Sequence, residues 1–159
     1  MTKQQERQRF IRYYREKTGK QQWDMNDVAK MARDMGWKLP SAPTPLEMLA
    51  REFSKAAREE TRVDPHTGQK YRVNHAFTAD SDGQVTLWVD IDEAPRHCMQ
   101  KSAVNRREQV VGDLVQLTLD LGHWNRMNPN EEPIGVPLDF TDDVQWRLNG
   151  GNSGEAEAA

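Results

Sequence analysis

The chain of 159 residues has only one cysteine, Cys98, and no long apolar run. One cysteine excludes an intramolecular disulfide and a zinc site built from several cysteines. A membrane-spanning helix needs roughly 18 consecutive apolar residues, which are absent. The first ten residues, MTKQQERQRF, also lack the apolar segment of a secretory signal. We therefore expect a cytoplasmic protein without a membrane-spanning segment.

The sequence also lacks the motifs of common catalytic and metal sites. It has no Gly-rich phosphate loop, no nucleophile elbow and no pair of histidines at metal-binding spacing. The DSDG stretch at 80–83 lacks the later glutamate of a calcium loop, so it predicts a turn. His97 and Cys98 are neighbours, but adjacent side chains on a helix point about 100° apart, so we expect no pairing. We predict that the chain is not an enzyme and needs no cofactor or metal.

Charge is divided unevenly along the chain, although the net charge is only -3. Residues 1–76 contain 16 Lys and Arg against 10 Asp and Glu, whereas residues 77–159 contain 6 against 15. A basic half joined to an acidic half suggests that the first half meets an anionic partner. Charge also fluctuates along ordinary chains, so the positions of the basic residues matter more than their number.

Apolar periodicity predicts two helices in the first 36 residues. The first covers about residues 4–17 and ends at Gly19, and the second covers about residues 25–35 after the N-cap Asp24. The first twenty residues are strongly basic. They form either a basic arm or helix that could follow a phosphate backbone or a solvated helix face. On the first interpretation we single out Arg9 and Arg12 as DNA contacts.

The stretch TPLEMLAREFSKAAREETR, residues 44–62, has the clearest helix start in the chain. Thr44 and Glu47 form a T-x-x-E capping box around Pro45. An apolar side, which we expect to be buried, faces away from a basic stripe with 4, 3, 4 spacing. This stripe is either a DNA-contacting surface or a solvated face with i, i+4 ion pairs. Its members are Arg51, Lys55, Arg58 and Arg62.

Alternating polar and apolar residues predict a β-hairpin after this helix. Its strands cover residues 70–77 and 84–92, and Lys70 and Arg72 lie on one face of the first strand. Asp90 and Asp92 on the second strand, and two further aspartates in the tip loop, are poorly suited to phosphate. Either the root of the first strand contacts DNA, or the hairpin serves only in packing.

A long helix is predicted from Pro95 to about Trp124. Its heptad pattern either packs on the preceding domain or pairs with a second copy. The seam residues that we expect at a homodimer interface are Val110, Leu114, Leu117 and Leu121. A Pro-rich segment follows, then a short helix over residues 141–148 that should bury Val144 and Leu148, and a disordered polar tail from residue 150.

Three helices, a hairpin and a long helix together resemble the winged helix-turn-helix class of DNA-binding domains. The stretches DMNDVAKMARDMG and TPLEMLAREFSKAAREE and the hairpin from Lys70 to Asp92 account for this resemblance. It implies that the third helix enters the major groove and that the hairpin is the wing. The expected fold is α+β, with a winged-helix domain at 1–92, the long helix at 93–128, the Pro-rich segment and short helix at 129–149, and the tail at 150–159.

The stretch LWVDIDEAPRHCMQKSAVNRREQVVGDLVQLTLD, residues 87–120, resembles a bacterial family of hypothetical proteins. This resemblance implies a bacterial source but no chemistry. The sequence thus leads to two hypotheses. The first is a dimeric transcriptional regulator that binds double-stranded DNA. The second is an adaptor that binds other proteins in a bacterial or mobile-element complex for defence or recombination.

Overall fold

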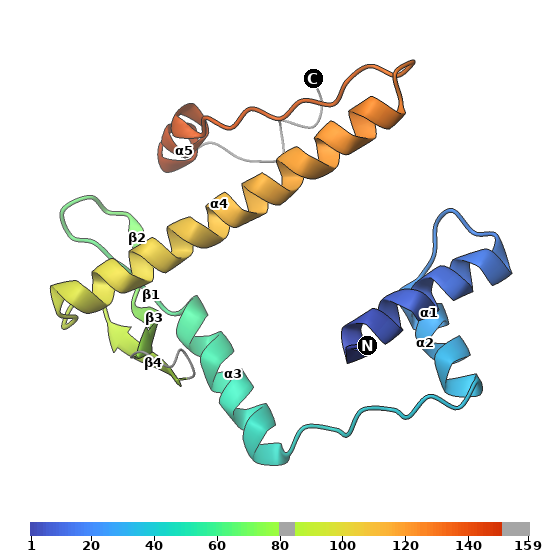
Figure 1. Ribbon diagram of the computed structural model, residues 1–159. Coiled ribbons are helices and arrows are strands. Elements are labelled where there is room, and N and C mark those ends of the chain that lie inside the picture. The colour runs from blue at the N-terminus through green and yellow to red at the C-terminus, as the bar shows by residue number, and fades with distance from the viewer. Residues whose placement is uncertain (80–84, 151–159) are drawn as a thin grey trace. The chain divides into compact units, whose positions relative to one another are not determined.

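The computed structural model describes residues 1–79 and 85–150 (Figure 1). These residues form five helices and two antiparallel sheets of two strands each, so the fold is α+β. The chain divides into two compact units, Met1–Phe53 and Ser54–Ala159, and the division falls inside the third helix. The winged-helix domain over residues 1–92 stays a prediction. The proposed disordered tail lies, except for Gly150, outside the described residues.

The first unit contains α1 (Lys3–Thr18) and α2 (Met25–Asp34). Phe10 and Tyr14 on α1 and Val28 on α2 form its buried core. The predicted helix boundaries are confirmed by their caps. Gly19 ends α1 with a φ of 66°, a left-handed conformation that glycine adopts at little cost, and the Asp24 side chain accepts a hydrogen bond from Asn26 N.

The third helix, α3 (Pro45–Glu59), begins as its sequence predicts but is packed differently. Glu47 N donates to Thr44 Oγ1 at 3.2 Å and Thr44 N donates to Glu47 Oε2 at 2.9 Å, so the capping box is formed. The prediction of a buried apolar side is wrong, because no residue of α3, all of which are described, is buried. Leu46 is 77% exposed and Phe53 is 68% exposed.

Two hairpins follow α3, where the sequence predicted one. Strand β1 (Thr61–Val63) pairs with β2 (Lys70–Arg72), and β3 (Asn74–Ala79) pairs with β4 (Val85–Asp90), both antiparallel. The prediction of a continuous first strand over residues 70–77 is therefore wrong. It missed β1 because the strand is short and directly continues a helical pattern.

Val73 explains why the predicted strand divides. Its N–H donates to Glu60 O at 3.1 Å, and its carbonyl accepts from Ile91 N at 2.8 Å. The backbone thus changes hydrogen-bonding partners at this residue, from the end of α3 to the end of β4. The side chain is only 1% exposed, so Val73 is the buried joint between the two hairpins.

The long helix α4 (Arg96–Met127) is confirmed as one element of 32 residues. Its first turns bury Cys98 and Ser102, and α4 packs on β3. The chain then returns along α4 to α5 (Thr141–Leu148), as Figure 1 shows. Asn125 exchanges two hydrogen bonds of 2.9 Å with Ile134, and Gln69 Nε2 donates to Leu148 O at 3.0 Å. The burial predicted for Val144 and Leu148 is wrong, because they are 51% and 50% exposed.

Candidate nucleic-acid interface

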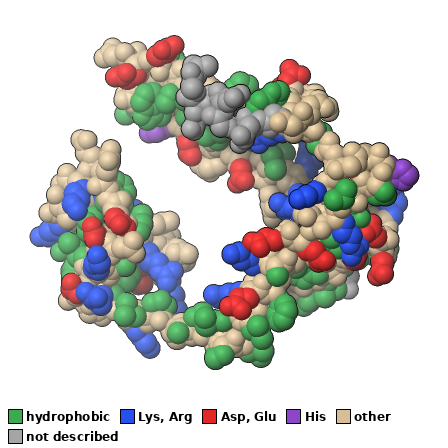
Figure 2. Space-filling model, turned by 180° about the vertical axis from the view of Figure 1, so that it is seen from behind, with side chains coloured by type: hydrophobic (Ala, Val, Ile, Leu, Met, Phe, Trp, Pro, Cys, Tyr) green, Lys and Arg blue, Asp and Glu red, His purple; other side chains and the backbone are tan. Residues whose placement is uncertain are grey.

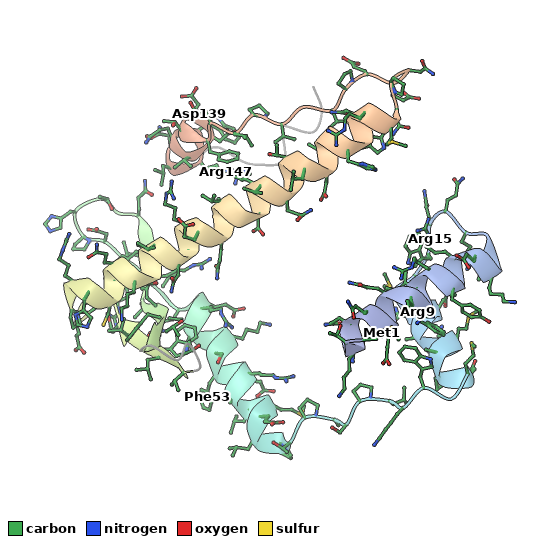
Figure 3. The ribbon with its side chains drawn as sticks, viewed as in Figure 1. Met1, Arg9, Arg15, Phe53, Asp139 and Arg147 are labelled. Atoms are coloured by element: carbon green, nitrogen blue, oxygen red, sulfur yellow. The ribbon has the colours of Figure 1, made fainter. Side chains whose placement is uncertain are left out.

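The outer side of α1 carries three exposed arginines, Arg9, Arg12 and Arg15, which we call the α1 basic face. At about 100° per residue, Arg12 lies opposite the buried Phe10 and Tyr14, and Arg9 and Arg15 lie on either side of it. Figure 3 labels Arg9 and Arg15 on this helix, and Figure 2 shows many Lys and Arg side chains over the first unit. Within the described residues, none of the three forms an ion pair with a carboxylate.

Neutral groups contact two cations of α1. The Arg15 guanidinium lies 4.7 Å from the centre of the Trp23 ring, and Lys17 Nζ lies 5.8 Å from the centre of the Tyr13 ring. A ring face attracts a cation and orients it without cancelling its charge. The α1 basic face therefore keeps its positive charge available to an external anion.

The α3 basic face consists of Arg51, Lys55 and Arg58, all exposed. Lys55 Nζ lies 4.0 Å from Glu59 Oε1 in an exposed i, i+4 pair, which is the solvated-face interpretation of the sequence. Arg58 lies 5.4 Å from the centre of the Trp88 ring. The predicted stripe is thus partly paired, and its arginines remain the stronger candidates for an anion.

Arg62 is not on α3, which corrects the sequence prediction. Helix α3 ends at Glu59, and Arg62 lies on β1 opposite Tyr71. Arg62 binds Asp90 through two hydrogen bonds, with Nη2 to Oδ2 at 2.8 Å and Nη1 to Oδ1 at 3.1 Å, and it also binds Asp92. Tyr71 Oη donates to Asp92 Oδ2 at 3.0 Å. We call these four residues the acidic clasp.

The pKa values in the acidic clasp are shifted by these contacts. The hydrogen bonds from Arg62 hold the pKa of Asp90 below its usual value, and those to both aspartates raise the pKa of Arg62. Desolvation, followed by the hydrogen bond to Asp92, raises the pKa of Tyr71. Two carboxylates thus compete with any phosphate for Arg62, so we leave it out of the proposed interface.

The acidic clasp also explains the acidic second strand that the sequence showed. Asp90 and Asp92 are two positions apart at the end of β4, and both carboxylates face one guanidinium. The two aspartates of the tip loop, Asp80 and Asp82, lie outside the described residues. A D-x-D pair at a strand end was the sequence signal for this clasp, but nothing in the sequence indicated that Arg62 was its partner.

The remaining predicted contacts on the hairpins, Lys70 and Arg72, lie on β2 and are exposed. Arg72 lines a hollow of about 360 Å³ together with Arg58, Trp88 and residues of α4. Lys70 does not line this hollow. The structure therefore brings two predicted DNA contacts, Arg58 and Arg72, around one concave surface in the second unit.

The predicted dimer seam on α4 is partly covered by the same chain. Leu114, Leu117 and Leu121 are half-buried on the side of α4 where Asn125 binds the returning segment, while Val110 is 53% exposed. Self-association through this seam stays a prediction. A second apolar row on α4 is more exposed, with side chains between 36% and 62% exposed. Its members are Val104, Val111, Val115 and Leu119.

Two further site predictions can be compared with the structure. Cys98 Sγ lies 3.4 Å from His97 Nε2, so the expectation that these neighbours stay apart is wrong. Among the described residues, no three His, Cys, Asp or Glu side chains are grouped to hold a metal ion, and no helix is long and apolar enough to span a membrane.

Comparisons with protein-family models, with curated protein sequences and with solved structures found no match to this chain.

Proposed function

We propose that this chain binds double-stranded DNA through the α1 and α3 basic faces, as a dimeric bacterial transcriptional regulator. One observation carries the proposal. The arginines of the α1 basic face are exposed and form no ion pair within the described residues, whereas the acidic clasp holds Arg62 between two carboxylates. Cations without carboxylate partners are the groups that phosphates bind most readily.

The spacing of the α1 basic face suits a phosphate backbone. Arg9, Arg12 and Arg15 follow one another every third residue, which is a rise of about 4.5 Å per step. Their guanidinium groups are long and flexible, and each binds a phosphate through two parallel hydrogen bonds. Binding would release counterions from the DNA, so the affinity should fall steeply as salt rises.

The α3 basic face supplies the candidates for base recognition in this proposal. An arginine in the major groove binds O6 and N7 of guanine with two hydrogen bonds. Arg51 and Arg58 are two turns, or about 10.5 Å, apart on one side of α3, which is a span of about three base pairs. The boundary between the two units falls inside α3, between Arg51 and Lys55, so each face is tested separately.

The test measures binding of a fluorescently labelled duplex by anisotropy over a range of salt concentrations. Arg9→Ala and Arg12→Ala should each weaken binding several-fold and lower the log–log salt slope by about 0.9, the value for one lost phosphate contact. Lys30→Ala is the matched control. It removes the same charge from the first unit, but Lys30 Nζ is already 3.3 Å from Asp27 Oδ1.

The proposal is wrong if the wild-type chain shows no salt-dependent binding to duplex DNA at low salt. It is equally wrong if Lys30→Ala weakens binding as much as Arg12→Ala, because the effect would then follow net charge alone. Selection of bound sequences from a random pool, repeated with Arg51→Ala and Arg58→Ala, separates a sequence-specific regulator from a non-specific binder.

A second function, that of a protein-binding adaptor, is favoured by the exposed apolar surface. On α3, Leu46, Leu49 and Phe53 are all at least 47% exposed, and Figure 3 shows Phe53 projecting from the helix. Large exposed apolar patches mark protein-interaction sites. Elution from heparin distinguishes the two functions, because a DNA-binding chain elutes only at high salt and an adaptor flows through.

A further inference from the structure

The hollow in the second unit combines three arginines from three different elements. Arg58 comes from α3, Arg72 from β2 and Arg106 from α4. Among the described residues, no aspartate or glutamate lines the hollow, and none of the three arginines forms an ion pair. A concave surface that gathers three cations without a carboxylate concentrates positive potential at one point.

The walls of the hollow are held in place by contacts between these elements. Asn74 Nδ2 donates to Ala57 O at 3.1 Å and to Glu60 Oε2 at 2.7 Å, which ties β3 to the end of α3. The buried His75 bonds through Nε2 to Arg72 O at 2.9 Å, which fixes the backbone of Arg72. Arg58 is held over the Trp88 ring. Because these side chains are already held in place, binding a ligand costs less conformational entropy.

The other lining groups are polar but uncharged, with apolar wall beside them. Asn105 and Gln109 lie one turn apart on α4, and Thr78 and Thr86 are paired across β3 and β4. These amides and hydroxyls both donate and accept hydrogen bonds. The volume, about 360 Å³, falls at the small end of ligand pockets, which span roughly 300–1,000 Å³.

We infer that the hollow lined by Arg58, Arg72 and Arg106 binds a phosphate group. Guanidinium forks match the phosphate oxygens in geometry and remain charged at every physiological pH. The hollow also has room for a small organic group next to the phosphate, for which the amides and hydroxyls provide hydrogen bonds. The phosphate has two sources: a small phosphorylated molecule of mononucleotide class, or one phosphodiester of a bound nucleic acid.

The inference goes beyond the proposed function. The hollow shares Arg58 with the α3 basic face, so the variants are made at Arg72 and Arg106, and the small-molecule arm involves no residue of α1. The first measurement is calorimetric titration of the full chain with AMP, with adenosine and with inorganic phosphate. The second is duplex binding by anisotropy. Both are done on the wild type and on Arg72→Ala, Arg106→Ala and Lys101→Ala. Lys101→Ala is the matched control, because Lys101 is an exposed cation of α4 that does not line the hollow.

A small-molecule source predicts that AMP binds, that adenosine does not, and that Arg72→Ala and Arg106→Ala each weaken AMP binding by about tenfold or more. A phosphodiester source predicts no AMP binding, together with a similar loss of duplex affinity in the same two variants only. In either case Lys101→Ala binds as the wild type does. Unfolding temperature is measured on each variant, and Arg106→Lys, which keeps the charge, should restore part of the binding if Arg106→Ala is unstable.

Two results overturn the inference. One is that neither AMP, nor phosphate, nor duplex binding depends on Arg72 or Arg106. The other is that Lys101→Ala lowers phosphate or duplex binding as much as Arg106→Ala does. The proposed function has a separate failure, since duplex binding that is insensitive to Arg9→Ala and Arg12→Ala leaves the result with AMP unaffected.

Discussion

Arg12 on α1 and Arg62 on β1 are the same residue type in opposite electrostatic surroundings. Arg12 is exposed on a helix face shared with other arginines, and it forms no ion pair within the described residues. Arg62 faces Asp90 and Asp92, and Tyr71 bonds to the second of these carboxylates. The number of arginines in a sequence therefore says less about anion binding than the number of carboxylates that reach each one.

The comparison also separates two uses of positive charge. On α1 the charge is available to a partner, because Arg15 and Lys17 contact the rings of Trp23 and Tyr13 and not carboxylates. In the second unit, the acidic clasp joins β1 to the end of β4, which are elements of different hairpins. We therefore expect arginine substitutions to affect binding in α1 and stability in the acidic clasp.

The largest effect should come from Arg62→Ala. This change leaves two carboxylates close together without their cation, so we expect the unfolding temperature to fall by roughly 5 °C. Thermal unfolding followed by circular dichroism measures it. Arg72→Ala is the control, because Arg72 lies on the neighbouring strand opposite Thr61 and is exposed.

The DNA affinity of the same variant tests whether Arg62 differs from the arginines of α1. At 10 °C, where Arg62→Ala should still be folded, its affinity for duplex DNA should equal that of the wild type. A loss of affinity as large as that of Arg12→Ala, without a change in unfolding temperature, would show that Arg62 is a DNA contact. Arg62 and Arg12 would then both be DNA contacts, whatever the number of carboxylates near each one.

Local sequence signals predicted the helices well, because each cap depends on residues three or four positions apart. The capping box of Thr44 and Glu47 and the glycine cap at Gly19 are examples. The acidic clasp was not predictable in the same way. Arg62 and Asp90 are separated by 28 positions, and a helical charge pattern that runs to Arg62 gave no sign that α3 ends at Glu59.

The apolar side of α3 shows a second limit of sequence patterns. Periodicity identifies which residues share a face, but not whether another element covers that face. Leu46 and Phe53 share the predicted face and are exposed in the structure. The basic faces were predictable as positions, whereas their pairing state depended on tertiary contacts such as that of Arg58 with Trp88.

A smaller effect is expected from pH, and it arises only in the acidic clasp. The pKa of Asp90 is lowered in the folded chain, mainly by hydrogen bonds from Arg62. A carboxylate of this kind stabilises the fold above its unfolded pKa, near 4, and this stability is lost as pH falls through the lowered value. Urea unfolding at several acidic pH values should therefore show that the free energy of unfolding decreases as the pH is lowered. Asp90→Asn should flatten that fall.

At alkaline pH the stability should fall as the pH rises, and the residue responsible is Tyr71. The pKa of Tyr71 is raised in the folded chain by desolvation and by the hydrogen bond to Asp92. Its contribution is complete below the unfolded pKa, about 10, and is lost as pH rises through the raised value. Tyr71→Phe should remove this alkaline loss without changing the acidic one. If both variants keep the wild-type pH profile, the acidic clasp does not contribute to stability.

The smallest effects are expected at Lys55, which is intermediate between the two arginines. Its Nζ lies 4.0 Å from Glu59 Oε1, and both side chains are more than two-thirds exposed. Exposed pairs of this kind contribute little, so Lys55→Ala should change the free energy of unfolding by no more than about 0.5 kcal/mol. Glu59→Gln removes the carboxylate and leaves Lys55, like Arg12, without an ion pair. If carboxylate partners decide which cations bind phosphate, this variant should bind duplex DNA about twofold more tightly at low salt. Glu52→Gln, which removes a negative charge from the same helix without freeing Lys55, is the matched control, and an equal gain in Glu52→Gln would assign the effect to net charge alone.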